Sequence, residues 1–188
     1  MKTVFLDRDG VINRKLPGDY VKSWDEFEFL PGAMEGLSNL KRLGFRLIVV
    51  TNQRGISLGK FSEGDLERIH SRMQEELGKC SAALDAIYYC PHENGRCECR
   101  KPGTGLFERA RQDFPDLNFR DSFVIGDSFS DMEAGAKIGA KLILVGQDAA
   151  AVSSTLRRNN IHVDEIAPSL REAVQRFVVK IDQRLTSG

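Results

Sequence analysis

The 188-residue sequence has no long apolar run, no excess of charge of either sign and no cysteines spread along its length. A transmembrane helix needs roughly 20 consecutive apolar residues, and no run approaches that length. The 27 basic and 27 acidic residues cancel, which argues against a general surface for nucleic acid or anionic membranes. Because the first apolar segment follows Met1 closely, we expect no signal peptide and a cytoplasmic location.

The four cysteines are confined to twenty positions, at Cys80, Cys90, Cys97 and Cys99. In a reducing compartment, such clustering indicates a metal site rather than disulfides. With His92, the last three cysteines offer three thiols and one imidazole, a set that suits a closed tetrahedral site for structural Zn²⁺. The alternative is a chance cluster of buried cysteines. Cys80 stands outside the set, at a predicted helix end, where a buried or free thiol is expected.

Two carboxylates, Asp7 and Asp9, end the first apolar run at residues 4–6 and precede Gly10. Acids this close tolerate each other best when a cation or a shared proton reduces their repulsion. Oxygen ligands of this kind favour Mg²⁺. In an open parallel sheet, ligands bind beyond the carboxyl ends of the strands, which is where both side chains are expected. For the pair alone, the alternative is an ordinary polar turn.

Apolar runs alternate with segments of helical periodicity along the chain. The runs predict strands at 4–6, 45–51, 85–89, 122–127, 141–145 and 162–166. The periodic segments predict helices at 33–44, 62–78, 105–114, 130–139, 150–159 and 168–185. This alternation indicates the α/β class with one Rossmann-like, doubly wound parallel sheet. Since no repeat or second core divides residues 1–188, we expect a single domain, and the balanced charge favours a monomer.

Polar residues also mark the ends of other predicted strands. Thr51 and Asn52 end the second strand, and Asp127 ends the fourth. Arg100 and Lys101 directly follow Cys99, the last residue of the cysteine cluster, so an ion bound there would order a loop that aims both cations at the site. Parallel strands bring their carboxyl ends to one edge of the sheet, so we expect these groups to converge on Asp7.

The order Asp-x-Asp, Thr, Lys and Gly-Asp-x-x-x-Asp, found within residues 4–145, resembles the four motifs of the haloacid dehalogenase superfamily of phosphotransferases. The resemblance implies that Asp7 attacks phosphorus to form an aspartyl-phosphate and that Asp9 is the general acid and base. It further implies Mg²⁺ bound by the Asp7 and Asp127 carboxylates and the Asp9 backbone carbonyl. Thr51 and Asn52 would bind phosphoryl oxygens, and Lys101 would supply fixed positive charge.

Within this superfamily, Val-Ile-Asn at 11–13 and Ile-Tyr-Tyr-Cys-Pro-His at 87–92 look most like the D-glycero-D-manno-heptose 1,7-bisphosphate phosphatase family. That family removes the 7-phosphate and leaves heptose 1-phosphate for lipopolysaccharide or surface-layer glycans. Only short loops separate the motifs, so the resemblance implies a capless enzyme whose selectivity comes from loop 14–24, Arg54 and the cysteine loop. The substrate-binding residues that it implies are Asp19, Tyr20, Asn52, Gln53, Arg54 and Arg100.

Two alternatives compete with this reading. Histidinol-phosphate phosphatase, a sister family, has the same nucleophile and a similar cysteine loop, and a catalytically silent binding module could use the same fold. Two departures bear on the preferred sugar and anomer: only four residues separate His92 from Cys97, and Ser128 stands where some members have Lys. Asp131 could support the metal through water or cap a helix. His70 is expected to be an ordinary surface or packing histidine.

Overall fold

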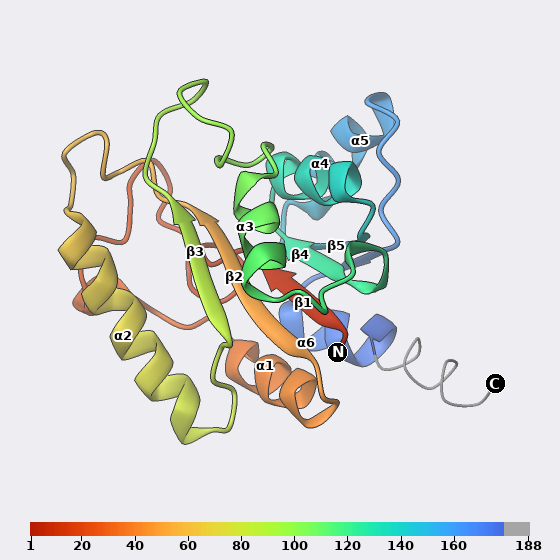
Figure 1. Cartoon of the computed structure of the whole chain (residues 1–188), viewed down its shortest axis with the longest axis horizontal. Helices are drawn as coiled ribbons and strands as arrows, with labels where there is room; N and C mark the ends of the chain where they lie inside the picture. Colours follow the sequence, from red (N-terminus) through yellow and green to blue (C-terminus); the bar gives the residue numbers. More distant parts are fainter. Residues whose placement is uncertain (179–188) are drawn as a thin grey trace.

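The computed structural model describes residues 1–178, in which six parallel strands lie between two layers of helices (Figure 1). The strands are β1 Thr3–Leu6, β2 Arg46–Asn52, β3 Ala86–Cys90, β4 Phe123–Gly126, β5 Lys141–Val145 and β6 Glu165–Ala167. Their order in the sheet is β3-β2-β1-β4-β5-β6. Leu6 pairs with Val49 of β2 on one side and with Ile125 of β4 on the other. The predicted doubly wound α/β fold is confirmed, with the ends of β1, β2 and β4 side by side.

Within residues 1–178, five α-helices connect the strands and a sixth follows β6: α1 Ala33–Arg42, α2 Glu63–Lys79, α3 Gly105–Asp113, α4 Phe129–Ile138, α5 Ala149–Arg158 and α6 Leu170–Ala173. Short 3-10 turns form at η1 Trp24–Glu26 and η2 Phe119–Asp121, and a π-helical turn, η3 Val174–Val178, follows α6. The predicted final helix therefore begins at Leu170, and its predicted part beyond residue 178 lies outside the described residues. Among residues 1–178, none of the helices has the length and apolarity that a transmembrane span requires.

The last strand is shorter than predicted and begins later. β6 starts at Glu165, whereas the apolar pattern predicts a start at 162. Asp164 explains the difference, because its side chain accepts a hydrogen bond from the Leu142 backbone N–H at 2.7 Å. Because this carboxylate occupies the backbone N–H of Leu142, the strand pairing does not extend to the residues before 164.

Alternate residues of the strands pack into two cores, one on each face of the sheet. Val4 and Leu6 point toward α1, α2 and α6, whereas Phe5 points toward α3, α4 and α5. The Phe5 ring meets Phe107 of α3 edge to face, with centroids 5.0 Å apart. A strand covered on both faces must be apolar throughout, which is why the run at 4–6 contains no polar residue before Asp7. The polar side chains are therefore confined to the strand ends.

The loop between β1 and α1 is held against the end of β1 by backbone pairing and an aromatic cluster. Asn13 forms an isolated bridge with Phe29, and Arg14 N–H donates to the Glu28 carbonyl at 2.8 Å. The rings of Trp24 and Phe27 stack at 4.9 Å. Packing of this kind stabilises a long irregular loop in one conformation, so residues 14–30 form a fixed wall beside the strand ends.

Candidate active site

Three carboxylates gather beyond the ends of β1 and β4. One oxygen from each of Asp7, Asp127 and Asp131 lies within 4.8 Å of the others. Burial raises the pKa of Asp7 to about 7 against the lowering effect of Lys101, and the charges of Asp131, Asp127 and Asp9 raise it further. Like charges held this close in a buried position favour the binding of a cation.

Lys101 provides one positive charge at this cluster. Its ammonium lies 3.0 Å from Asp7 Oδ1 and 2.6 Å from Asp131 Oδ1, and it donates to the Val50 carbonyl at 2.6 Å. The residue is only 4% exposed. Burial lowers the pKa of Lys101, but the carboxylates of Asp131 and Asp7 outweigh burial and hold it above its ordinary value. The group therefore stays charged across the physiological range.

Asn52 fixes the backbone of Lys101 from the end of β2. Its side-chain amide donates to the Lys101 carbonyl at 3.0 Å and accepts from the Lys101 N–H at 3.0 Å. This two-point contact joins the end of β2 to the loop before α3. Asn52 is therefore engaged with the chain itself, and its predicted contact with phosphoryl oxygens stays a prediction.

The Asp9 carboxylate is bound by three neighbouring side chains. Its Oδ1 accepts from Arg8 Nη2 at 2.9 Å and from Asn13 Nδ2 at 2.9 Å. Its Oδ2 accepts from Gln53 Nε2 at 2.8 Å, and that same nitrogen donates to Thr51 Oγ1 at 2.9 Å. Burial raises the pKa of Asp9, but the Arg8 charge and these hydrogen bonds outweigh burial and hold it below its ordinary value. Gln53, a predicted substrate ligand, here joins Asp9 to Thr51.

Asp127 has one oxygen with a partner and one without. Its Oδ2 accepts from Lys15 Nζ at 2.9 Å. Its Oδ1 is buried and has no hydrogen-bond partner among the residues that the structure describes. Gly10 lies directly against this carboxylate, because a Cβ at Gly10 would stand 2.3 Å from Asp127 Oδ2 and its φ is +92°. Only glycine meets both requirements, so the position that follows the acid pair is fixed by close packing.

Asp131 caps the helix that follows Asp127. Its Oδ2 accepts from the Ser128 N–H at 3.0 Å and from the Ser128 hydroxyl at 2.5 Å, which completes a capping box at the start of α4. Its other oxygen contacts Lys101. Of the two roles that the sequence left open for Asp131, helix capping is therefore present in the structure. The Asp131 carboxylate therefore caps α4 and also holds Lys101 beside Asp7.

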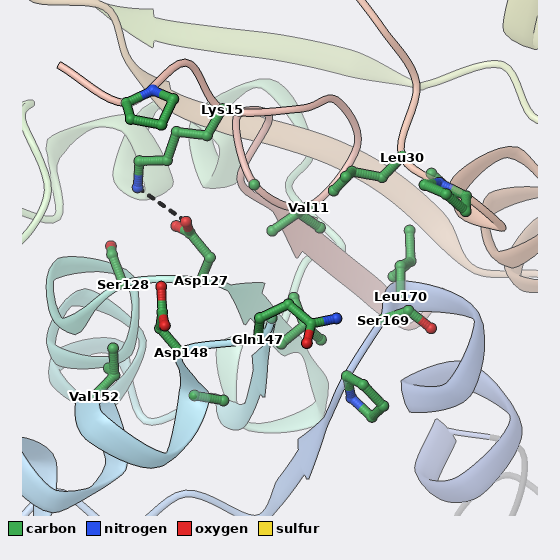
Figure 2. Close-up of a pocket in the computed structure, with 18 of the residues that line it drawn as sticks. Val11, Lys15, Leu30, Asp127, Ser128, Gln147, Asp148, Val152, Ser169 and Leu170 are labelled. Atoms are coloured by element: carbon green, nitrogen blue, oxygen red, sulfur yellow. Dashed lines mark hydrogen bonds and ion pairs between the residues drawn. The ribbon is translucent and has the colours of Figure 1, made fainter. Parts of the chain in front are cut away.

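A cavity of about 730 Å³ opens next to Asp127 (Figure 2). Its walls come from the loop after β1 and from the loops after β4, β5 and β6, including Lys15, Ser128, Gln147 and Ser169. Figure 2 shows the Lys15 ammonium directed at the Asp127 carboxylate. The space gives a bound molecule room beside Asp127, whereas Asp7 and Asp131 are not among the residues that line it.

The remaining predicted substrate residues lie in loops outside the walls of this cavity. Asp19 forms a surface ion pair with Lys22 at 2.6 Å, and Tyr20 packs against the ring of Phe61 with centroids 6.1 Å apart. Arg100 Nε donates to Asn94 at 2.6 Å, which fixes it to the cysteine loop. Arg100 Nη1 and Arg54 Nε are buried and, within the described residues, have no hydrogen-bond acceptor.

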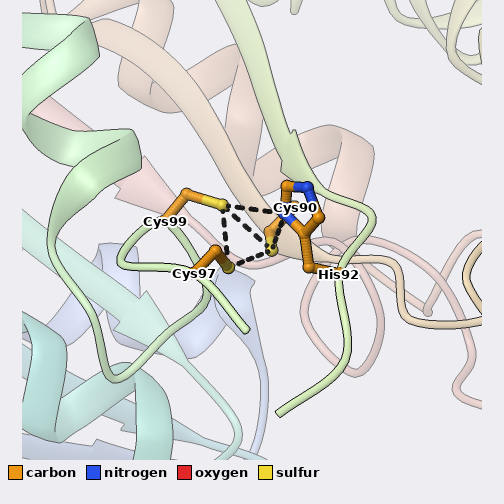
Figure 3. Close-up of side chains that lie close together, drawn as sticks. All are labelled: Cys90, His92, Cys97 and Cys99. Carbon is orange, nitrogen blue, oxygen red and sulfur yellow. Dashed lines mark hydrogen bonds between the residues drawn. The ribbon is translucent and has the colours of Figure 1, made fainter. Parts of the chain in front are cut away.

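The predicted cysteine and histidine cluster is assembled at the end of β3 (Figure 3). The sulfurs of Cys90, Cys97 and Cys99 lie 3.1–3.5 Å apart, and His92 Nδ1 lies 3.3 Å from Cys99 and 3.6 Å from Cys90. Four ligand atoms around one tetrahedral ion are separated by distances of this order. Cys80 lies apart from the cluster, with its thiol directed at the Leu77 carbonyl at 3.2 Å.

Arg8, Asn13 and Lys15 lie at the site although no predicted role points to them. Arg8 and Asn13 fall inside the stretch that carries the acid pair, and their contacts with Asp9 follow from the turn at residues 8–13. The role of Asn13 at the site could have been suspected only from its polar side chain, which closely follows the strand-ending Asp-x-Asp-Gly. Nothing in the sequence around Lys15 points to its contact with Asp127, because the two residues are 112 positions apart.

Comparison with known proteins places the chain among phosphatases. A HAD-hydrolase-like family model matches residues 98–173. D-glycero-alpha-D-manno-heptose-1,7-bisphosphate 7-phosphatase of Mycobacterium bovis is 43% identical over 138 residues, which are 73% of this chain and 73% of that protein. D-glycero-beta-D-manno-heptose-1,7-bisphosphate 7-phosphatase of Escherichia coli K12 is 41% identical over 151 residues, or 75% of this chain and 78% of that protein.

Solved structures give the same result. A D,D-heptose 1,7-bisphosphate phosphatase of B. bronchiseptica, crystallised with magnesium and phosphate, superposes with a TM-score of 0.85 at 30% identity and covers 96% of this chain and 99% of that one. The corresponding Burkholderia thailandensis protein has a TM-score of 0.69 at 28% identity, with 95% and 99% covered. With relatives this similar over most of both chains, the chain belongs to the heptose 1,7-bisphosphate phosphatase family of haloacid dehalogenase-like hydrolases.

Proposed function

We propose that this protein is a Mg²⁺-dependent phosphatase that removes the 7-phosphate of D-glycero-D-manno-heptose 1,7-bisphosphate and releases heptose 1-phosphate. The observation that carries the proposal is the placement of Lys101 3.0 Å from Asp7 in a cluster with Asp127. A buried cation and three carboxylates around one point suit the transfer of a phosphoryl group, whose charge must be stabilised on several oxygens.

Asp7 is the proposed nucleophile. Its carboxylate attacks phosphorus, the bond from phosphorus to the sugar oxygen breaks, and an aspartyl-phosphate forms. Lys101 holds one Asp7 oxygen, and the Arg8 backbone N–H donates to the same atom, Oδ1, at 2.8 Å. The other oxygen, Oδ2, is the one directed at the substrate in this proposal. A fixed carboxylate loses little rotational freedom when it attacks.

Asp9 is the proposed general acid and base. It gives its proton to the departing sugar oxygen and afterwards takes a proton from the water that hydrolyses the aspartyl-phosphate. The contacts from Arg8, Asn13 and Gln53 fix the orientation of the carboxylate for both transfers. Because these contacts favour the ionised form, the incoming phosphate dianion would have to raise the pKa of Asp9 before it donates a proton.

The donor atoms at this site fit Mg²⁺. All are oxygens, and the buried Asp127 Oδ1 has no hydrogen-bond partner within the described residues. The Asp7 and Asp127 carboxylates and the Asp9 backbone carbonyl would hold the ion, and Thr51 would hydrogen-bond a phosphoryl oxygen. When bound, Mg²⁺ neutralises charge on the transferring group. A related protein was crystallised with magnesium and phosphate, which supports this assignment.

Two arginines are the proposed ligands of the second phosphate of the substrate. Arg54 Nε and Arg100 Nη1 are buried N–H donors that, as far as residues 1–178 go, have no acceptor. An unpaired guanidinium donor suits a phosphate, which accepts several hydrogen bonds at once. Asp19 and Tyr20 would shape the loop beside them. Selectivity would then depend on these loops, because no cap domain covers the site within the described residues.

The test of this function is a comparison of kcat/KM on both anomers of heptose 1,7-bisphosphate and on histidinol phosphate, with Mg²⁺ present. We expect the better heptose anomer to exceed histidinol phosphate by at least about 100-fold, because buried arginines without a phosphate partner are costly. Phosphorus NMR of the product should show loss of the 7-phosphate. Equal rates on all three compounds would reject the heptose assignment.

The cysteine loop is the proposed site of a structural Zn²⁺ ion. The three thiols and His92 leave no ligand position for water, which is typical of a structural site. The loop also packs tightly against the segment that leads into α3, since a Cβ at Gly103 would stand 2.2 Å from the Glu98 carbonyl oxygen. Ordering of the loop therefore fixes Lys101 and Arg100, the two residues that follow Cys99.

Replacing Cys97 with Ser is expected to lower bound zinc well below one per chain and to reduce the melting temperature by on the order of 10 °C. Removing one ligand opens the site, and the loop before Lys101 loses its anchor. Metal analysis and thermal unfolding measure both effects. Cys80→Ser is the matched control, because Cys80 lies outside the cluster and should leave the zinc content unchanged. Equal zinc in the two variants would contradict the assignment.

Three further assignments belong to this proposal. Residues 1–188 form a single domain, the protein is a monomer, and it works in the cytoplasm on a small sugar phosphate. The single sheet with its two flanking cores supports the first. Thiols clustered for metal binding support a reducing compartment. Light scattering of the purified protein tests the oligomeric state directly.

A further inference from the structure

Arg8 is an arginine without exposed surface, located between the two acids at the end of β1. One of its nitrogens, Nη2, donates to Asp9 Oδ1 at 2.9 Å and lies 3.5 Å from Gln53 Oε1. A guanidinium has five N–H groups and no acceptor, and a buried donor without a partner is unfavourable. The orientation of Arg8 is therefore set by whichever acceptors surround it.

His70 of α2 supplies the acceptor for the other end of this guanidinium. Arg8 Nη1 lies 3.2 Å from His70 Nε2, and His70 is only 8% exposed. Arginine can only donate, so Nε2 accepts and the imidazole carries its proton on Nδ1. Burial, with a further contribution from the Arg8 charge, lowers the pKa of His70 to about 3, so the ring remains neutral whenever the enzyme is folded and active.

Arg8 is the one side chain within residues 1–178 that hydrogen-bonds the His70 ring. The Tyr89 ring of β3 lies 6.2 Å away, tilted, and Ile69 and Met73 of α2 belong to the apolar core. Among described charged groups, Arg8 and Asp9 are the ones that act on the pKa of His70. An apolar side chain could fill this position, so packing alone does not account for a histidine here.

We propose that His70 is a positioning residue for the acid–base group Asp9. Its Nε2 holds Arg8 Nη1, which directs Arg8 Nη2 to Asp9 Oδ1 and fixes the carboxylate for proton transfer. The inference rests on the proposed role of Asp9. It extends the site to α2, which contains none of the four motif residues of the sequence analysis, and it contrasts with the surface or packing role predicted for His70 from the sequence.

If His70 positions Asp9, the effect of losing His70 on the reaction rate should depend on the leaving group of the substrate. A sugar oxygen leaves as a strongly basic alkoxide unless Asp9 supplies a proton as the P–O bond breaks. A p-nitrophenolate is weakly basic and leaves with the electron pair of the broken bond without being protonated. Misplacement of Asp9 therefore slows transfer of the phosphoryl group to Asp7 much more from a sugar phosphate than from p-nitrophenyl phosphate. Hydrolysis of the aspartyl-phosphate, in which Asp9 activates water, is common to both substrates.

The experiment compares His70→Leu with His70→Gln on these two substrates. Leucine leaves Arg8 Nη1 without an acceptor, so we expect kcat/KM on heptose bisphosphate to fall at least about 10-fold, a part of the 10²–10⁴-fold that general acid catalysis contributes. On p-nitrophenyl phosphate kcat/KM should stay within about 2-fold, because kcat/KM covers the steps up to departure of the leaving group and not hydrolysis of the aspartyl-phosphate. Glutamine can place its carbonyl oxygen near the position of Nε2. His70→Gln should therefore remain within about 3-fold of wild type on both substrates, since one acceptor replaces another.

Ile69→Val is the control for a general loss of stability, because it removes one methylene from a buried residue of the same helix and leaves the acceptor of Arg8 Nη1 in place. It should lower the melting temperature slightly and slow neither substrate selectively. The proposal is overturned if His70→Leu slows both substrates equally or neither, if His70→Gln is as slow as His70→Leu, or if Ile69→Val shows the same selective loss. Should wild type itself reject heptose bisphosphate, the proposed substrate fails. The His70 comparison then proceeds with another alkyl phosphate that wild type hydrolyses.

Discussion

Replacing Asp7 with Asn should abolish hydrolysis of heptose bisphosphate, with a loss of kcat of about 10⁴-fold or more, as is typical when a covalent nucleophile is removed. The amide cannot form the aspartyl-phosphate, and the residual rate reflects only binding and charge stabilisation by the remaining groups. Phosphate release measured under saturating Mg²⁺ gives the result. A variant that retained turnover within about tenfold of wild type would exclude the covalent route.

The same variant should be more stable than wild type when Mg²⁺ is removed with a chelator. Burial raises the pKa of Asp7 from its ordinary value of 3.8 to about 7. Between these two values the unfolded chain is ionised while the folded site still holds a proton. The free energy of unfolding therefore falls as the pH rises from about 4 to 7, and the loss is complete above the folded pKa. Asparagine removes this pH-dependent loss of stability, because it carries no charge at any pH.

The signature of Asp7→Asn is therefore a melting temperature above that of wild type at pH 8 and equal to it near pH 4, without Mg²⁺. Asp116→Asn is the matched control, since this surface aspartate pairs with Arg46 far from the carboxylate cluster. It should keep full activity. An inactive Asp7→Asn protein that is also less stable at pH 8 would indicate damaged folding and would leave the nucleophile unsupported.

Much of this site follows from where polar residues stand relative to apolar runs. Asp7, Thr51 and Asp127 end buried strands, and parallel strands with adjacent positions must bring such ends together. The order of β1 between β2 and β4 fulfils that expectation. The thiols and His92 are likewise close in sequence, so a short loop is enough to assemble them. In both cases the local pattern determines the contact.

Contacts between distant polar side chains do not follow from the pattern. Asn52 ends β2, Gln53 follows it, and both are predicted to face substrate. In the structure, however, Asn52 holds Lys101, 49 positions away, and Gln53 holds Asp9, 44 positions away. His70 shows the same difficulty, because its partner Arg8 is 62 positions distant. Such partners depend on how loops and helices pack in three dimensions, and a hydrogen-bonding side chain carries no periodic signal in the sequence.

The second large effect is expected from replacing Lys101 with Met. The ammonium is almost completely buried between Asp7 and Asp131, so its loss leaves two carboxylates without their cation. Breaking a buried ion pair in this way costs about 3–5 kcal/mol. That corresponds to a fall in melting temperature of on the order of 10 °C for a chain of this size. Loss of fixed charge at the transferring group should lower kcat by about 10²–10³-fold.

Adding Asp131→Asn to Lys101→Met separates the two effects. The second change removes one of the uncompensated charges, and its amide oxygen can still cap α4, so the double variant should recover part of the lost melting temperature. It should recover no activity, because the cation beside Asp7 is still absent. Lys79→Met, which removes a surface lysine paired with Glu76, should alter neither property. If the double variant were as unstable as Lys101→Met, the stability of this site would not depend on the charge balance between Lys101 and Asp131.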